Sequence, residues 1–227
     1  DSSNVYVINR GGNNIQVLDP SDNFSTVANY STGDNSNPHD MEIISSTKAY
    51  ITLYQKSYIL IVNPRTGVEL GRIDLSAFAD SDGVPDIDQI VRVGTKVFVT
   101  VQRLVNYSPS AAGLVVVIDT ATDTVVDTDT VTAGTQAITL NGYNPQAIEY
   151  LASSGKLYVS CAGSYFSDAV PGGIDSIDSA TYAVSNVMSK TALNGTPGDI
   201  KMLSSTQGYV VVSGADWSNS IRAFNPS

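Results

Sequence analysis

Short runs of alternating hydrophobic and polar residues fill this chain, and the same kinds of run return at intervals. One run sets an aromatic residue among Val, Ile and Thr, with the aromatic at positions 6, 50, 98, 158 and 209, so that successive copies are 44, 48, 60 and 51 residues apart. Short alternating runs rich in β-branched and aromatic residues predict β-strands. Their return at intervals of about 50 residues predicts a repeat architecture.

Three further runs accompany the aromatic run and complete the repeat. A second β-branched run ends in Asp or Asn followed by a turn residue, at residues 15–20, 60–64, 116–120, 174–179 and 221–226. A third run is led by a proline that precedes the next aromatic by 12 or 13 residues, at residues 37–41, 84–88, 144–148 and 196–200. A fourth strand, such as residues 67–73, lies between the second and third runs. Four short strands per interval predict an all-β chain of four-stranded antiparallel β-propeller blades.

These runs resemble the YVTN-type β-propeller repeat of bacterial and archaeal surface proteins. The resemblance is carried by VYVIN at residues 5–9, IDTAT at residues 118–122 and NPHD at residues 37–40, and it extends over nearly the whole chain. The chain is also similar to propeller-containing lipoproteins and surface proteins of bacteria. The resemblance implies that the proline-led strand is the innermost of each blade, followed by the aromatic strand, the Asp- or Asn-ended strand and an outer strand.

We expect a single β-propeller domain over residues 1–227 that holds about four and a half blades. The chain starts at the second strand of one blade and stops just after the third strand of its fifth copy. Because unpaired sheet edges are unfavourable, we expect the domain to be incomplete at its C-terminal end, with further residues closing a ring of about six or seven blades. The alternative is a strained closure with five blades.

The composition predicts where the protein acts, and it argues against nucleic acid as a partner and against a membrane span. Charged residues are only 15% of the chain, so Ser, Thr, Asn, Asp and Gly must cover most of its surface, as in exported β-rich proteins. We expect an exported protein at the cell surface or outside the cell, with the periplasm as an alternative. Asp1 stands first, so either a leader has been removed or the chain is a fragment. The net charge of −10 argues against nucleic acid, and the chain has no apolar run of eighteen residues that would predict a membrane span.

Cysteine and histidine, two residue types that often take part in catalysis or metal binding, occur once each. Cys161 lies in an apolar strand, which predicts a small buried thiol, and a lone cysteine forms no disulfide within the chain. His39 stands beside Asp40 at the start of a proline-led strand, where a propeller opens its central channel. Two interpretations of His39 stand: a hydrogen-bonded structural side chain, or a general base in a pocket at the channel mouth.

Acidic residues recur at the same corners. Asp40 and Asp199 lie two residues after the corner proline, and Asp88 lies three after it. In superposed blades these carboxylates ring one end of the channel, where they repel one another unless a cation or solvent lies between them. Ca²⁺ takes about six to eight oxygen ligands in loose geometry and is the cation expected there. Ala147 breaks the pattern at a fourth corner, and solvent alone is the alternative.

The loops that follow the aromatic strands are unequal in length, and the longer ones carry aromatic residues. Tyr107, Tyr165, Phe166 and the sole tryptophan, Trp217, lie in these loops, which we expect to leave the blades on one face. Aromatic residues are enriched at protein contacts, and loops carry much of protein function. The sequence therefore predicts a patch that binds a protein or carbohydrate partner. The alternative is that these side chains fold back onto the blades.

No catalytic motif occurs in the chain. We therefore expect a non-enzymatic scaffold that binds its partner on the loop-bearing face. Two alternatives stay open. A lactonase-like hydrolase would use a cation at the channel mouth to polarise a carbonyl, with His39, Asp40, Asp88 and Asp199 as its site residues. A structural spacer would only separate other domains at the cell surface.

Overall fold

The computed structural model describes residues 3–227, which consist largely of antiparallel β-strands. The chain divides into two compact units, the first ending at Ile90 and the second running from Val91 to Ser227. Each unit is described by itself below, and the expectation of one domain over residues 1–227 stays a prediction. No helix in residues 3–227 is long and apolar enough to cross a membrane.

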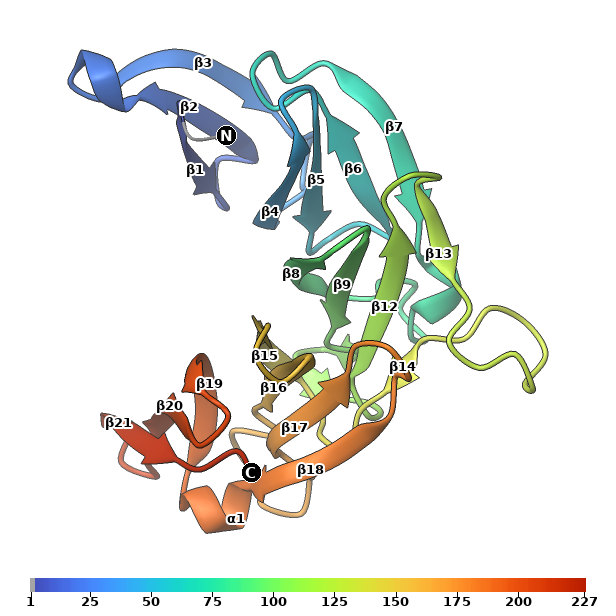
Figure 1. Cartoon of the computed structure of the whole chain (residues 1–227), viewed down its shortest axis with the longest axis vertical. Coiled ribbons are helices and arrows are strands. Elements are labelled where there is room, and N and C mark those ends of the chain that lie inside the picture. Colours follow the sequence, from blue (N-terminus) through green and yellow to red (C-terminus); the bar gives the residue numbers. More distant parts are fainter. Residues whose placement is uncertain (1–2) are drawn as a thin grey trace. The chain divides into compact units, whose positions relative to one another are not determined.

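The first unit contains a three-stranded and a four-stranded sheet, whose strands can be followed in Figure 1. The smaller sheet has the order β1-β2-β3 and consists of β1 (Val5–Asn9), β2 (Asn14–Asp19) and β3 (Ser25–Ser31). The larger has the order β4-β5-β6-β7 and consists of β4 (Pro38–Ser45), β5 (Lys48–Leu53), β6 (Tyr58–Val62) and β7 (Glu69–Asp74). In both sheets, strands that are adjacent in the sequence are also adjacent in the sheet, and every neighbouring pair is antiparallel.

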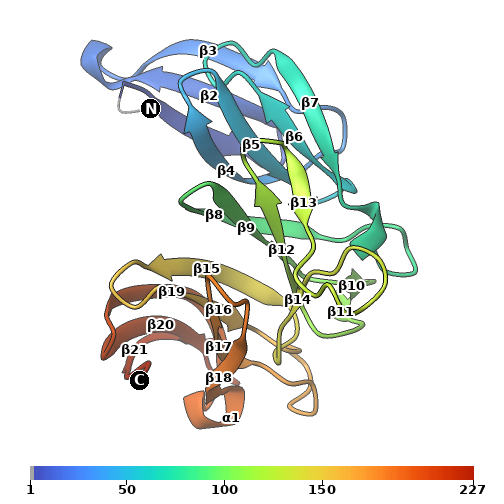
Figure 2. The same cartoon turned by 45° about the vertical axis from the view of Figure 1, so that its right-hand side comes forward.

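The second unit repeats this meander in three further sheets (Figure 2). One sheet consists of β8 (Ile87–Val93), β9 (Lys96–Val101), β12 (Leu114–Asp119), β13 (Thr124–Val126) and β14 (Ile138–Thr139). Its order is β13-β12-β9-β8, and β14 also pairs with β12. The first four residues of β8, 87–90, precede the division between the units. The next sheet consists of β15 (Pro145–Leu151), β16 (Lys156–Cys161), β17 (Gly173–Asp178) and β18 (Val184–Ser189), in that order. The last consists of β19 (Thr196–Ser204), β20 (Gln207–Ser213) and β21 (Asn219–Phe224), also in chain order.

Short elements lie between these strands. They are the 3₁₀ turns Pro20–Asp22 and Ser76–Phe78, the small hairpin β10 (Leu104–Val105) with β11 (Ser108–Pro109), and the one-turn helix α1 (Lys190–Leu193). The prediction of strands from the repeated runs is confirmed. Aromatic runs form β1, β5, β9, β16 and β20, and proline-led runs form β4, β8, β15 and β19. The order within each four-stranded sheet, from the proline-led strand to the outer strand, is also confirmed.

A side-chain hydrogen bond explains why the second run of every repeat ends in Asp or Asn. In each copy, the side-chain oxygen accepts a hydrogen bond from the backbone N–H two residues later, which bends the chain into a turn. These bonds join Ser21 to Asp19 (2.7 Å), Arg65 to Asn63 (3.0 Å), Ala121 to Asp119 (2.8 Å), Ala180 to Asp178 (3.0 Å) and Ser227 to Asn225 (3.0 Å). The recurring acid or amide is therefore a turn-forming residue at the end of β2, β6, β12, β17 and β21.

The aromatic anchors of the middle blades lie in the core. Tyr50, Phe98 and Tyr158 are at most 2% exposed. Tyr50 belongs to the first unit, whose main cluster packs Ile15 against buried residues of β5 and β6. The second unit holds two clusters, one around Phe98 and one around Tyr158. Full burial of such a side chain contributes about 1.5–3 kcal/mol, so Phe98 and Tyr158 hold their blades to the apolar residues of these clusters.

Asp175 is a buried polar centre of the second unit. It lies in β17 and is 1% exposed. Its carboxylate accepts hydrogen bonds from the backbone N–H groups of Asn141 and Gly142, at 2.8 and 2.9 Å, and from the side-chain amides of Asn141 and Asn186, at 3.3 and 3.2 Å. A buried carboxylate is tolerated when its oxygens are hydrogen-bonded in this way. Asp175 therefore fastens the segment at residues 141–142 to the sheet of β17.

Cys161 is buried at the end of β16, which confirms the prediction of a buried thiol. Burial raises the pKa of this thiol well above its ordinary value, and the nearby Asp175 carboxylate raises it further. Since the thiolate is the reactive form, we expect the folded chain not to react with DTNB, whereas the chain unfolded in guanidinium releases one equivalent of thionitrobenzoate. Rapid stoichiometric release from the folded chain would contradict this burial.

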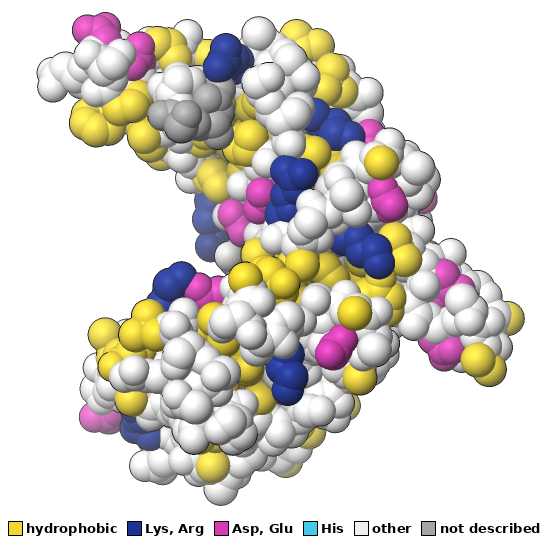
Figure 3. All heavy atoms as spheres, viewed as in Figure 1, with side chains coloured by type: hydrophobic (Ala, Val, Ile, Leu, Met, Phe, Trp, Pro, Cys, Tyr) yellow, Lys and Arg dark blue, Asp and Glu magenta, His cyan; other side chains and the backbone are white. Residues whose placement is uncertain are grey.

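The surface carries no concentration of positive charge on the face seen in Figure 3, where neutral polar groups and backbone predominate. Lys and Arg total only 12 of the 227 residues. Some large hydrophobic side chains are nevertheless strongly exposed, among them Phe166 (87%), Tyr107 (89%) and Trp217 (64%). Extensive exposure of large aromatic residues is a feature of interaction sites when the residues lie together, and two of these three do so.

Candidate functional site

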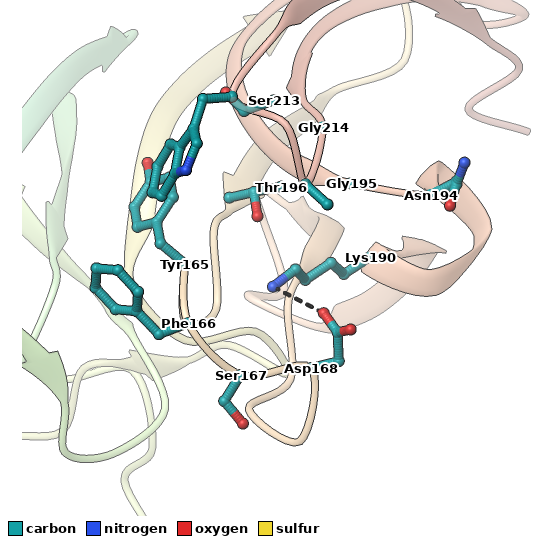
Figure 4. Close-up of a pocket in the computed structure, with 12 residues that line it drawn as sticks. Tyr165, Phe166, Ser167, Asp168, Lys190, Asn194, Gly195, Thr196, Ser213 and Gly214 are labelled. Carbon is teal, nitrogen blue, oxygen red and sulfur yellow. Dashed lines mark ion pairs between the residues drawn. The ribbon is translucent and has the colours of Figure 1, made fainter.

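A cavity of about 300 Å³ opens in the second unit between two loops. One loop joins β16 to β17 and the other joins β20 to β21, and residues around the end of α1 and the start of β19 complete the wall (Figure 4). The lining residues are Tyr165, Phe166, Ser167, Asp168, Lys190, Asn194, Gly195, Thr196, Ser213, Gly214, Ala215 and Trp217. We refer to this cavity as the aromatic pocket.

Three of the four aromatic residues singled out in the sequence meet at this pocket. The rings of Tyr165 and Trp217 lie near parallel, 17° apart, with centroids separated by 6.3 Å. Phe166 is also 6.3 Å from Trp217 but is tilted by 60°. These side chains are 41%, 64% and 87% exposed for Tyr165, Trp217 and Phe166 respectively, so they are not folded back onto the blade.

The loop that carries Trp217 is held by its own hydrogen bonds. The N–H of Trp217 donates to the carbonyl oxygen of Gly214 at 3.0 Å, and the N–H of Gly214 donates to that of Ser218 at 2.8 Å. The Asp216 carboxylate accepts from the hydroxyl of Ser218 at 2.6 Å and from its backbone N–H at 3.1 Å, and these bonds lower the pKa of Asp216. Trp217 has a φ of 63°.

An ion pair forms the opposite wall of the aromatic pocket. The Lys190 ammonium donates to the carbonyl oxygen of Ser164 at 2.5 Å and lies 3.4 Å from the carboxylate of Asp168 (Figure 4). The Lys190 side chain is 11% exposed, whereas that of Asp168 is 97% exposed. The carboxylate is therefore free to meet a ligand while the lysine stays fixed. The cap of α1 positions the lysine, because the Ser189 hydroxyl accepts from the N–H of Ala192 at 3.1 Å.

Tyr107 does not line the aromatic pocket. It lies in the turn between β10 and β11, where it is 89% exposed and has a φ of 62°. The structure thus brings together Tyr165, Phe166 and Trp217 and leaves Tyr107 outside that group. The role of all four residues in binding a partner stays a prediction.

His39 lies in a separate, buried arrangement in the first unit. Its Nδ1 is 2.7 Å from the Asp88 carboxylate, and both side chains are 6% exposed. The imidazole stacks on the ring of Tyr54, with centroids 4.2 Å apart and an angle of 10°. Its Nε2 is buried and has no hydrogen-bond partner among residues 3–227. The histidine is thus oriented by a carboxylate, in the way that both structural and acid–base histidines are.

The Asp40 carboxylate is hydrogen-bonded to the backbone. Its two carboxylate oxygens accept hydrogen bonds from the N–H groups of Met41 at 2.8 Å and Ile90 at 3.1 Å. Asp199 lies in β19 of the second unit. Within residues 3–227, no group of three or more His, Cys, Asp or Glu side chains is placed to bind a metal ion. The predicted calcium site at Asp40, Asp88 and Asp199 thus gains no support from the geometry and stays a prediction.

Burial raises the pKa of the Asp40 carboxyl, hydrogen bonds from Ile90 and Met41 offset part of this shift, and the Asp88 carboxylate adds to it. A group with a raised folded pKa favours the folded state below its unfolded pKa, and this contribution is lost as the pH rises through the folded pKa. We therefore expect the free energy of unfolding of the wild type, relative to Asp40→Asn, to fall as the pH rises above the ordinary aspartate pKa of about 3.9. Urea unfolding of both proteins measures the difference. A flat or rising difference would rule out a raised pKa.

Comparison with known proteins identifies the fold and leaves the activity open. No protein-family model matches the chain, and no curated protein sequence matches it. Solved β-propeller structures do match. They include virginiamycin B lyase from Staphylococcus aureus, at 12% identity, a TM-score of 0.64, and coverage of 96% of this chain and 66% of that one.

Two further structures give the same picture. A candidate 6-phosphogluconolactonase from Bacteroides uniformis matches at 13% identity and a TM-score of 0.65, over 99% of this chain and 64% of that one. A chain of a nidogen/laminin complex matches at 13% identity and a TM-score of 0.61, over 94% of this chain and 71% of that one. The chain thus spans about two thirds of the length of these structures. The β-propeller fold predicted from the repeats is confirmed.

Several pocket residues were not identified from the sequence. Lys190 follows an outer strand and belongs to no repeated run, and Ser213 lies four residues after the aromatic residue of its run, a position with no common residue type among the copies. Asp168 follows Tyr165 and Phe166 in the same loop and belongs to no repeated run. The one available signal was length, because the segment between β16 and β17 that contains Asp168 is longer than the equivalent segment between β5 and β6.

Proposed function

We propose that the chain is a ligand-binding β-propeller, acting at the cell surface or outside the cell, that binds its partner at the aromatic pocket. The observation that carries this proposal is the clustering of Tyr165, Phe166 and Trp217, all exposed, around a cavity. Aromatic side chains that lie together at the rim of a pocket supply large contact areas at a small entropic cost, and they dominate binding energies in many interfaces.

The pocket favours binding over chemistry. Its only acid–base pair among the described lining residues is Lys190 with Asp168, and these two form an ion pair with each other at 3.4 Å. A nucleophile activated by an adjacent base needs a hydrogen-bonded pair aimed at a shared reacting atom. The described lining offers instead a rigid Trp217 loop, flat aromatic faces and neutral hydroxyl groups. Rigid presentation of such groups reduces the entropy that is lost on binding.

Replacing Phe166 with alanine tests the proposal. Because Phe166 is 87% exposed, its loss leaves the core intact. We expect Phe166→Ala to weaken retention of the chain on an array of immobilised extracellular proteins and glycans by about tenfold. The matched control is Phe24→Ala, which removes an exposed aromatic (57%) with a φ of 56° from the first unit and should leave retention unchanged. Equal retention of all three proteins, or retention of none, would overturn the proposal.

A second candidate function, a lactonase-like hydrolase, draws on one observation: the buried Nε2 of His39 has no partner among residues 3–227, while Nδ1 is held by Asp88. A histidine oriented in this way has the arrangement of a general base. The test is lactone hydrolysis by the wild type with and without EDTA, compared with His39→Gln. Activity that is lost in His39→Gln would favour the hydrolase, and the absence of any hydrolysis would remove it. EDTA should have no effect on array retention by the aromatic pocket.

A further inference from the structure

We infer that the aromatic pocket binds a neutral sugar unit of a glycan. This inference rests on the proposed function and names the chemical class of its ligand. A pyranose ring presents two surfaces at once: a face of C–H bonds, which packs on flat aromatic rings, and a rim of hydroxyl groups, each of which donates and accepts hydrogen bonds. The pocket offers a counterpart to each surface.

The aromatic side of the pocket fits the C–H face of a ring. Tyr165 and Trp217 are near parallel, so they present flat faces in one orientation, while Phe166 stands at 60° to Trp217 as an adjoining wall. The three side chains are exposed, and covering them removes apolar area from water. A platform with a side wall suits a compact saturated ring.

The polar side of the pocket fits the hydroxyl rim. The Asp168 carboxylate is 97% exposed and accepts hydrogen bonds, and the Lys190 ammonium beside it donates them. Neighbouring hydroxyl groups on a sugar use both functions, one donating to the carboxylate and the other accepting from the ammonium. The remaining polar lining is neutral and mixed, from Asn194, Thr196 and Ser213 (Figure 4). Such a lining has partners for several hydroxyl groups.

The charge and the volume of the pocket narrow the class of sugar that it can bind. Lys190 and Asp168 cancel each other, and the chain as a whole carries a net charge of −10, which repels uronic acids and sulfated chains. The volume of about 300 Å³ lies at the lower end of the range for small-molecule sites. The pocket is therefore suited to one or two neutral rings at a time, as at the end or along the side of a longer glycan.

Isothermal titration calorimetry of the full chain tests this inference. The probes are neutral oligosaccharides (cello-, chito-, xylo-, malto- and manno-oligosaccharides) and, as comparators, an oligogalacturonate and a heparin fragment. We expect at least one neutral probe to bind, and we expect Phe166→Ala and Asp168→Ala each to weaken that binding by about tenfold or more. Phe24→Ala should bind as the wild type does. Both test positions are highly exposed, and circular dichroism confirms that the variants fold.

The outcomes separate this inference from the proposed function. Binding only of the acidic probes, or neutral binding that survives both substitutions, overturns the assignment of a neutral sugar. If no oligosaccharide binds but an arrayed protein is retained in a Phe166-dependent manner, the sugar assignment is wrong and the pocket is a protein-binding site. If neither class is retained, both the sugar assignment and the proposed function are wrong.

Discussion

Trp217→Ala is expected to weaken partner binding by about 30-fold or more, the largest effect of any substitution at the aromatic pocket. Trp217 is the common neighbour of Tyr165 and Phe166, so its loss removes one ring and leaves the other two without their packing partner. The side chain is 64% exposed, and alanine at the same backbone conformation should cost the fold little. The measurement is the dissociation constant of the arrayed partner for wild-type and variant chains.

Two further variants sharpen this prediction. Trp217→Phe keeps a flat face and should recover part of the binding, which a loss through loop unfolding would not allow. Tyr107→Ala removes an aromatic that is 89% exposed in the same unit but does not line the pocket, and it should bind like the wild type. If Tyr107→Ala weakens binding as strongly as Trp217→Ala, the contact surface is broader than the pocket.

Asp175→Ala is expected to destabilise the second unit by about 1–3 kcal/mol. The substitution removes the acceptor for the backbone N–H groups of Asn141 and Gly142 and for two side-chain amides. Gly142 is buried, and a buried donor left without a partner costs about 1–3 kcal/mol, whereas Asn141 and Asn186 are exposed residues whose donors can turn to water. Because the sole tryptophan, Trp217, lies in this unit, urea unfolding followed by its fluorescence reports on the second unit directly.

Two controls accompany Asp175→Ala. Asp178→Ala removes a carboxylate three residues later in the same strand, where it only shapes the exposed turn, and should cause a much smaller loss. Asp175→Asn keeps the shape but replaces one acceptor oxygen with a donor that faces other donors, so an intermediate loss is expected. Equal stability of wild type and Asp175→Ala would mean that residues 141–142 are held by other contacts.

The blade pattern was predictable because each repeat satisfies its hydrogen bonds locally. The Asp or Asn that ends a strand, such as Asp119, makes its turn with the residue two positions later, so sequence alone locates both strand end and turn. The aromatic anchors were predictable from their place in the alternating strand pattern, and Phe98 packs in a cluster that draws on its own sheet and on β16 and β17 of the next sheet. Neither inference needed the path of a long loop.

The pocket was predictable only in part, because loops that are distant in sequence form it. The sequence indicated that Tyr165, Phe166 and Trp217 lie in long loops. It did not indicate that these three meet while Tyr107 stays outside, since that depends on the path of each loop. Asp40 shows a second limit. Its position two residues after a proline predicts a channel carboxylate, but it does not predict the hydrogen bonds from Met41 and Ile90, of which the second comes from a strand 50 residues away.

Acrylamide quenching of Trp217 tests the binding role of the aromatic pocket most directly. Trp217 is the only tryptophan, so every change in emission comes from this pocket. With the retained partner added to saturation, we predict a blue-shifted emission and strong protection from acrylamide, both following the same binding curve. A partner that binds while Trp217 keeps its free emission and its full quenching would show that binding occurs elsewhere on the chain, which contradicts the account.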